Sequence, residues 1–271
     1  RDRLSTLPPD QLTLDGMMAA YEDADFEKME EIRARVDAIV GDPETADRLK
    51  AWYRQLCKRP CFHDEYLQSF NNPHTHLVDT DGQGVERITE RGVVVAGTEY
   101  ELDCIIFASG FEVGTPHTER AGFDVVGRDG VKLSDYWADG MRTMHGTYIH
   151  GFPNAFLVQL FQGANLVSNV PHNLTEAGKT IAMVIRHAID RGAARVEVTA
   201  EAQDAWLTLL RQAPPRMMGG TDCTPGYYNN EGQPDANSFT SAAGYPYGAQ
   251  AYFRFLDEWR STGTFDGLAF T

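Results

Sequence analysis

The feature that most constrains the fold is an unbroken apolar run, Cys104-Ile105-Ile106-Phe107, inside the stretch 102–111. Four residues rich in β-formers are too few for a helix. The run therefore predicts a strand buried on both faces, as in a parallel sheet covered by helices. It leads into Ala108-Ser109-Gly110, small residues at the carboxyl end, where open α/β sheets bind ligands. A second run, 155–161, ends in the same way at Gln162-Gly163, so we expect two neighbouring, mostly parallel strands.

Length and charge exclude several classes of protein. The 271 residues are enough to bury a sizeable core. A net charge of −15 argues against nucleic acids and anionic membrane surfaces as partners. No apolar run approaches 18 residues, and the polar start of the chain does not resemble a signal peptide. We therefore expect a cytoplasmic protein that does not bind membranes, of unknown oligomeric state.

Metal binding is not predicted. Cys57 and Cys61 have a Cx3C spacing, but no second pair completes a ligand set. His74 and His76 lie two residues apart without a third ligand in view, so we interpret them as surface residues.

Before and after the two apolar runs, the pattern alternates between helices and short strands. Apolar residues at helical spacing predict a helix from Asp25 to Gly41, and Asp42-Pro43 predicts the start of another. Strands at 76–79, 85–89 and 93–96, separated by turn residues, predict a small antiparallel meander. Further helices are predicted before Gly192, after the N-cap residue Thr199, and over 249–260; a brief strand is expected at 196–198.

A local basic spot interrupts the acidic chain. Arg54, Lys58 and Arg59 gather beside Pro60, whereas the first 50 residues hold 13 acidic and 7 basic side chains. Such a spot can bind a phosphate or stabilise an anionic intermediate. It can equally complement the dipole at a helix C-terminus. The residues alone leave both interpretations open.

With these pieces in order, the chain resembles the Baeyer–Villiger monooxygenases, flavoenzymes with two dinucleotide-binding domains. The similarity runs from about Phe26 to the C-terminus. The stretches that carry it are Cys57-Lys58-Arg59-Pro60, 102–111, Gly151-Phe152-Pro153-Asn154, Ser168-Asn169 and Asn229-Asn230-Glu231-Gly232-Gln233-Pro234.

The resemblance implies FAD and NADPH as cofactors, and O2 and a ketone as the reactants. The expected reaction inserts one oxygen atom next to the carbonyl, through a C4a-peroxyflavin, and gives an ester or lactone. Arg59 matches the catalytic arginine that stabilises the peroxyflavin anion, and Lys58 matches the residue that pairs with the NADPH 2′-phosphate. Ser109 and Gly110 match a turn beside the cofactors. The segment from Gln162-Gly163 to Asn169-Val170 matches the backbone along the flavin ring.

Several features of the family pattern are missing. No GxGxxG follows a strand, and neither the F-x-G-x-x-x-H-x-x-x-W-P run nor the acidic partner of the catalytic arginine is present. Thr224 stands where the best-known members have Trp. The resemblance therefore implies an incomplete α/β chain, the C-terminal part of a two-dinucleotide-binding-domain flavoprotein, with a small β-meander and a helical C-terminal region. The expected division is 1–57 (helical linker, tail of the NADPH-binding domain), 58–172 (returning part of the FAD-binding domain) and 173–271 (helices and substrate loop).

Two alternatives remain open. One is an N- or S-oxygenating flavin-containing monooxygenase, since those enzymes share the Ala-Thr-Gly strand. The other is a catalytically inert ligand-binding or interaction fragment, because the glycine loops that hold FAD phosphates are absent. We expect the isolated chain to be inactive and, with an unpaired sheet edge, to express poorly.

Overall fold

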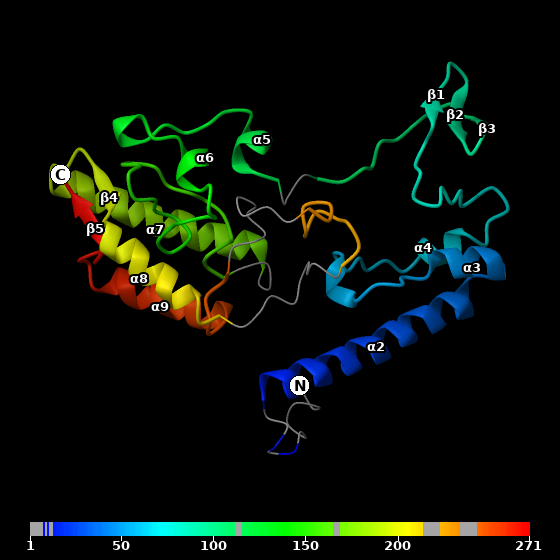
Figure 1. Ribbon diagram of the computed structural model, residues 1–271, viewed down its shortest axis with the longest axis horizontal. Helices are drawn as coiled ribbons and strands as arrows, with labels where there is room; N and C mark the ends of the chain where they lie inside the picture. The colour runs from blue at the N-terminus through cyan, green and yellow to red at the C-terminus, as the bar shows by residue number, and fades with distance from the viewer. Residues whose placement is uncertain are drawn as a thin grey trace. The chain divides into compact units, whose positions relative to one another are not determined.

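The computed structural model describes residues 8, 10, 13–111, 115–164, 169–213, 223–233 and 243–271. The chain divides into two compact units, Arg1–Phe111 and Glu112–Thr271 (Figure 1). Among the helices of the described ranges, none combines the length and the hydropathy needed to cross a membrane.

The first unit is built on a long helix, α2 (Leu14–Ile39). Thr13 caps it by accepting a hydrogen bond from the Gly16 N–H, so the helix begins well before the Asp25 start that periodicity predicted. The face that packs inward also differs from the prediction. The buried side chains are Asp25, Met29, Arg33, Val36 and Val40. Met29 and Val36 are as predicted, whereas the predicted Phe26 is 63 % exposed. Two of these five buried side chains are charged, which an apolar pattern cannot reveal.

Three short helices follow: α3 (Pro43–Leu49), the 3-10 helix η2 (Gln55–Cys57) and α4 (Tyr66–Ser69). The predicted cap of α3 is confirmed, because the Asp42 carboxylate accepts from the Thr45 N–H at 2.9 Å. Ala46 of α3 packs with Val36 and Val40 of α2 in a small apolar cluster. The first unit therefore has its own core, although a modest one.

The predicted β-meander is confirmed in part: the strands expected at 85–89 and 93–96 are present with shifted bounds, whereas 76–79 forms no strand and 98–101 forms one that was not predicted. Its strands are β1 (Arg87–Ile88), β2 (Gly92–Val95) and β3 (Thr98–Glu101), all antiparallel in the order β1-β2-β3. Val94 and Val95 are buried, whereas β1 and most of β3 are exposed. Because successive side chains of a strand point to opposite faces, β2 is buried on both faces at Val94 and Val95.

The predicted buried strand at 102–107 is wrong. Residues 102–111 are all exposed and form no strand, and Ile106 and Phe107 are 86 % and 77 % exposed. The last main-chain hydrogen bond here runs from the Leu102 N–H to the Arg91 carbonyl; within the described ranges, 103–111 make no further one. A strand cannot satisfy its own N–H and C=O groups. The run has the composition of a sheet centre without neighbouring strands in this unit.

The second unit contains five α-helices in its described parts: α5 (His117–Ala121), α6 (Leu133–Tyr136), α7 (Val170–Asp190), α8 (Ala200–Leu210) and α9 (Ala249–Ser261). A 3-10 helix, η3 (Arg128–Gly130), precedes α6. Strands β4 (Val196–Val198) and β5 (Leu268–Phe270) pair antiparallel. The strand predicted at 196–198 is confirmed, as is Thr199 as the cap of α8, accepting from the Ala202 N–H at 3.2 Å.

The core of this unit lies between α7, α8, α9 and the β4–β5 pair. Its buried members come from all of these elements and include Val184, Val198, Trp206, Leu256 and Trp259. A second cluster packs around α6: Leu133, Trp137, Met141, Ile149, Phe152 and Phe161. Both clusters are dominated by large aromatic and branched side chains, which give this unit the larger core.

The second predicted strand, 155–161, is also wrong. Only Phe156 forms a ladder contact, an isolated antiparallel bridge with Tyr148. The segment instead folds back through side-chain hydrogen bonds: the Gln159 side chain donates to the Phe161 carbonyl (2.7 Å) and accepts from the Phe161 N–H (2.5 Å). These bonds replace a strand ladder.

Candidate functional site

Lys58 and Arg59 leave η2 as an extended segment. Lys58 is half-buried, and its ammonium lies 6.0 Å from the centre of the Tyr53 ring, the outer limit of a cation–π contact. Burial, and next the charge of Cys61, raise the pKa of Tyr53, so the ring facing Lys58 is a neutral phenol. Arg59 is exposed. The Arg59 side chain is therefore in contact with solvent, whereas Lys58 is partly covered.

Ser109 and Gly110 lie at the end of the exposed stretch 102–111. Gly110 has φ +92° and no atom within 4 Å of a built Cβ. There is room for a side chain at this position, but the positive φ angle favours glycine. The turn has the small, open character that the sequence predicted, without the strand that was expected to lead into it.

Gln162 is buried, with φ +57°, and all of its polar groups are used inside the protein. Its side chain accepts from the Thr143 hydroxyl (2.5 Å) and donates to the Met141 carbonyl (2.7 Å). Its main-chain carbonyl accepts from the Trp206 indole N–H (3.1 Å), and its N–H donates to the Ala243 carbonyl (3.1 Å). Gln162 is thus a hub that fixes the loop leading to Gly163.

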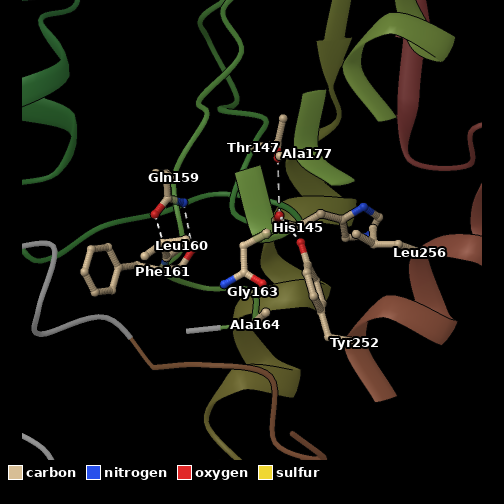
Figure 2. A pocket seen from close by; sticks show the side chains of 11 residues that line it. His145, Thr147, Gln159, Leu160, Phe161, Gly163, Ala164, Ala177, Tyr252 and Leu256 are labelled. Carbon is tan, nitrogen blue, oxygen red and sulfur yellow. Dashed lines mark hydrogen bonds between the residues drawn. The ribbon is translucent and has the colours of Figure 1, made fainter. Parts of the chain in front are cut away.

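Gly163 sits against the ring of Tyr252, where a built Cβ would lie 2.9 Å from ring atoms. Only glycine fits this approach. Gly163 also lines a small cavity with Asn173 of α7 and Tyr252 of α9 (Figure 2). The cavity has room for about one water molecule, so it cannot hold a ketone. The loop at Gly163 and the first turns of α7 both line this cavity.

The same cavity is bordered by His145, a buried residue that sequence reasoning missed. Aromatic rings meet it edge-on: its ring centre lies 4.7 Å from that of Trp206 and 4.8 Å from that of Trp259. Burial lowers the pKa of His145 from 6.5 to about 3. The imidazole is therefore neutral at physiological pH. No local sequence signal marks this residue, because helices distant in sequence create its surroundings.

Asn169 and Val170 begin α7. The Asn169 side chain caps the helix by accepting from the His172 N–H at 3.1 Å, and the first turn carries no acidic side chain. Asn169 is exposed and Val170 half-buried. The partial positive charge of this N-terminus thus faces no protein carboxylate within its first turn.

The loop 223–233 is organised by Asn229, which is 5 % exposed. Its amide donates to the carbonyls of Cys223 (3.1 Å) and Thr224 (3.3 Å). Its side-chain oxygen accepts from the N–H groups of Gly226 (3.0 Å) and Gly232 (3.1 Å). Asn229 therefore fixes the position of Thr224. Pro234, which follows this loop, and Ser168, which precedes Asn169, lie outside the described residues.

The eight predicted site residues fall into two groups of four, one per unit: Lys58, Arg59, Ser109 and Gly110 in the first, and Gln162, Gly163, Asn169 and Val170 in the second. In the part of the chain that the structure describes, no group of three or more His, Cys, Asp or Glu side chains could hold a metal ion.

Comparison with known proteins gives the chain relatives over nearly its whole length. No protein-family model matches the sequence. The chain is 48 % identical over 264 residues to a Baeyer-Villiger monooxygenase of Streptomyces coelicolor, covering 96 % of this chain and 43 % of that protein. It is 43 % identical over 265 residues to the FAD-binding monooxygenase hmp7 of Hypomyces subiculosus, covering 97 % and 43 %.

The fold agrees with these relatives. The polycyclic ketone monooxygenase of the fungus Thermothelomyces thermophila superposes with a TM-score of 0.82 at 38 % identity, over 98 % of this chain and 43 % of that structure. The chain thus spans less than half the length of each of these three proteins.

Proposed function

From the relationship of this chain to part of the Baeyer–Villiger monooxygenases, we propose that it belongs to an enzyme that uses FAD, NADPH and O2 to insert one oxygen atom next to a ketone carbonyl. The product is an ester or lactone. The observation that carries the proposal is 48 % identity over 264 residues to a Baeyer-Villiger monooxygenase. Bound FAD, reduced by NADPH, would supply the activated oxygen; the residues below bind, orient and stabilise charge.

Arg59 is assigned the catalytic role. Its guanidinium is a planar, permanently charged donor group, and it is exposed to an incoming anion. Negative charge that develops on oxygen during oxygenation is stabilised most by a donor already fixed in place. Arg59 is held immediately after a short helix, which restricts its main chain.

Lys58 is assigned to the 2′-phosphate of NADPH. Its half-buried ammonium beside the neutral ring of Tyr53 leaves a compact positive charge at the surface. Such a point charge binds a phosphate well. The assignment predicts a preference for NADPH over NADH, since the latter lacks this phosphate.

The flavin edge is assigned to main-chain groups of the second unit. The residues fit this role: Gly163 carries no side chain, Gln162 holds the loop rigidly, and the N-terminus of α7 presents no acidic side chain in its first turn. An electron-rich ring edge is favoured at such an N-terminus. Gln162 acts here by fixing the loop, with Asn169 and Val170 at the helix end. Ser109 and Gly110 are assigned to the other cofactor-facing turn.

The proposed division of labour follows from these assignments. Residues 1–57 form the helical tail of the NADPH-binding part, 58–172 the returning part of the FAD-binding domain, and 173–271 the helices and loop that border the substrate.

The test is a product screen on the full open reading frame that contains this sequence. The purified protein is given NADPH, isotopically labelled dioxygen and a panel of ketones, amines and sulfides. The proposal predicts esters or lactones that carry one labelled oxygen atom. Oxidised amines or sulfides without any ester would favour the N- or S-oxygenating alternative. If no substrate gives a product and NADPH is not oxidised, an inert binding role would be favoured.

A further inference from the structure

Helix α2 makes a row of polar contacts to the segment that leads into Lys58 and Arg59, through the buried Asp25 and Arg33 and the exposed Asp37. At one end, the Asp37 carboxylate pairs with the Lys50 ammonium at 3.0 Å. In the middle, the Arg33 guanidinium donates to the Ala51 carbonyl at 2.7 Å. At the other end, the Asp25 carboxylate accepts from the Gln55 N–H at 3.1 Å. We name these three α2 residues, Asp25, Arg33 and Asp37, the polar seam.

The polar seam holds the segment 50–55 along the side of helix α2. From Asp25 to Asp37 the helix rises about 18 Å, at about 1.5 Å per residue. The segment 50–55 bends at Tyr53, so it spans less than the roughly 17 Å of a fully extended chain. Lys50 and Arg54 have extended main-chain angles (ψ 134° and 148°). The contacts run in opposite order along the two elements, so the segment lies antiparallel along the helix and is held at both ends.

Asp25 is the last contact before the basic pair. The N-cap residue of η2, Arg54, makes no side-chain cap; Asp25 supplies the acceptor from another element. It is 7 % exposed, and a carboxylate bond to a main-chain N–H is charge-assisted and therefore strong. Arg33, also 7 % exposed, lies over the Trp52 ring at 4.9 Å. Burying two charged side chains is costly, and here both bond to the same short connector.

We propose that Asp25, through the polar seam of α2, is a positioning residue that sets the place of Lys58 and Arg59. The inference rests on the function proposed above for these two residues. Asp25 is assigned no contact with coenzyme or substrate in this proposal. It acts by fixing the first N–H of η2, four residues before the catalytic arginine, because small displacements of a charge-stabilising group reduce its effect strongly.

The first experiment needs no activity. Hydrogen exchange is followed in the full open reading frame for the wild type, for Asp25→Ala, and for the control Asp23→Ala, an exposed acid on the same helix. The proposal expects the amides of residues 55–59 to exchange about tenfold faster in Asp25→Ala, with β2 and β3 unchanged. Exchange at 55–59 that matches the Asp23→Ala control would overturn it.

The second experiment measures two ratios that do not depend on the amount of folded enzyme: NADPH over NADH preference in kcat/KM, and product formed per NADPH oxidised. Asp25→Ala is expected to lower each about 3- to 10-fold, and Asp25→Asn, which keeps an acceptor oxygen, to restore most of the loss. If Asp25→Ala does not fold, Asp25→Asn is expected to shift both ratios slightly in the same direction. A purely structural role would lower the melting temperature and leave both ratios unchanged, which would overturn the proposal.

Failure of the proposed function can be distinguished from failure of the Asp25 proposal. If the proposed function is wrong, the wild type and Asp23→Ala will show no preference for NADPH or will form no oxygenated product. In that event the exchange experiment still decides whether Asp25 fixes the segment.

Discussion

The hydroxyl of Tyr252 donates a hydrogen bond of 2.7 Å to the main-chain carbonyl oxygen of His145. This bond ties α9 to a turn in which His145 adopts φ +56°, a left-handed conformation uncommon for histidine. Trp206 of α8 and Trp259 of α9 close over the imidazole. Helices α8 and α9 of the second unit thus pack against the turn that carries this neutral histidine.

The first prediction concerns acid stability. Burial lowers the pKa of His145 from its usual 6.5 to about 3 in the folded chain. Between about pH 6.5 and pH 3, the unfolded state therefore binds a proton at this residue and the folded state does not. Stability from this residue is therefore complete above about pH 6.5 and falls as the pH drops toward 3, by about 1.4 kcal/mol per pH unit. Urea unfolding of the second unit at a series of pH values measures the slope.

The control for this prediction is His145→Asn, because asparagine tolerates positive φ and does not titrate. The variant is expected to be less stable at neutral pH and to lose that part of the acid slope. Equal slopes in the variant and the wild type would contradict the assignment.

A second prediction tests the close approach of Gly163 to Tyr252. Gly163→Ala places a methyl group 2.9 Å from the ring, and such overpacking costs about 1–3 kcal/mol. Gly178→Ala is the matched control: it lies in α7 with no atom within 4 Å, and should stabilise by about 0.5–1 kcal/mol. Denaturant unfolding compares the two. Similar effects of both variants would show that the tight contact does not constrain this loop.

A third prediction concerns the buried ion pair between α9 and α7. The Arg260 guanidinium, 4 % exposed, lies 2.7 Å from the Glu176 carboxylate and donates to the Thr180 hydroxyl at 3.0 Å. Arg260→Met leaves the Glu176 carboxylate with only the more distant Lys179 ammonium, at 3.8 Å, and should cost about 3 kcal/mol. Arg186→Met, in an exposed pair with Asp190, should change stability by less than about 0.5 kcal/mol. A cost for Arg260→Met no larger than for Arg186→Met would refute the role of the pair.

A fourth prediction concerns the exposed run at 104–107. An apolar extended segment without strand neighbours is a site for association, so the 271-residue chain alone should self-associate. Ile106→Lys should increase the monomer fraction in sedimentation, whereas Val85→Lys, at a residue 52 % exposed, should not. If Ile106→Lys associates as much as the unchanged chain, self-association does not depend on the run 104–107.

Sequence reasoning was right where local rules decide. The caps at Asp42 and Thr199 depend on residues a few positions apart, and both are confirmed. The antiparallel strand pair around Arg91-Gly92 is confirmed as well, whereas the strand predicted at 76–79 is not formed. The strands at 102–107 and 155–161 were wrong because a strand needs partners that hydrophobic pattern alone does not supply.

The candidate site divides in the same way. Short motifs pointed to Lys58 and Arg59. They could not reveal Asp25 and Arg33, charged residues buried on a face that periodicity assigns to apolar side chains. Nor could they reveal His145, whose burial arises from helices about 60 and 110 residues away in sequence.

The most direct test of the account is Arg59→Ala in the full open reading frame, with NADPH oxidation and ester formation measured separately. Arg35→Ala, at an exposed arginine of α2, serves as control. The account predicts that Arg59→Ala still oxidises NADPH while ester formation falls about 10²–10³-fold, and that Arg59→Lys restores little of it. If Arg59 only complements a helix end, the variant would form ester normally and lose about 0.3–1 kcal/mol of stability; that result would contradict the assignment of Arg59 as the catalytic residue.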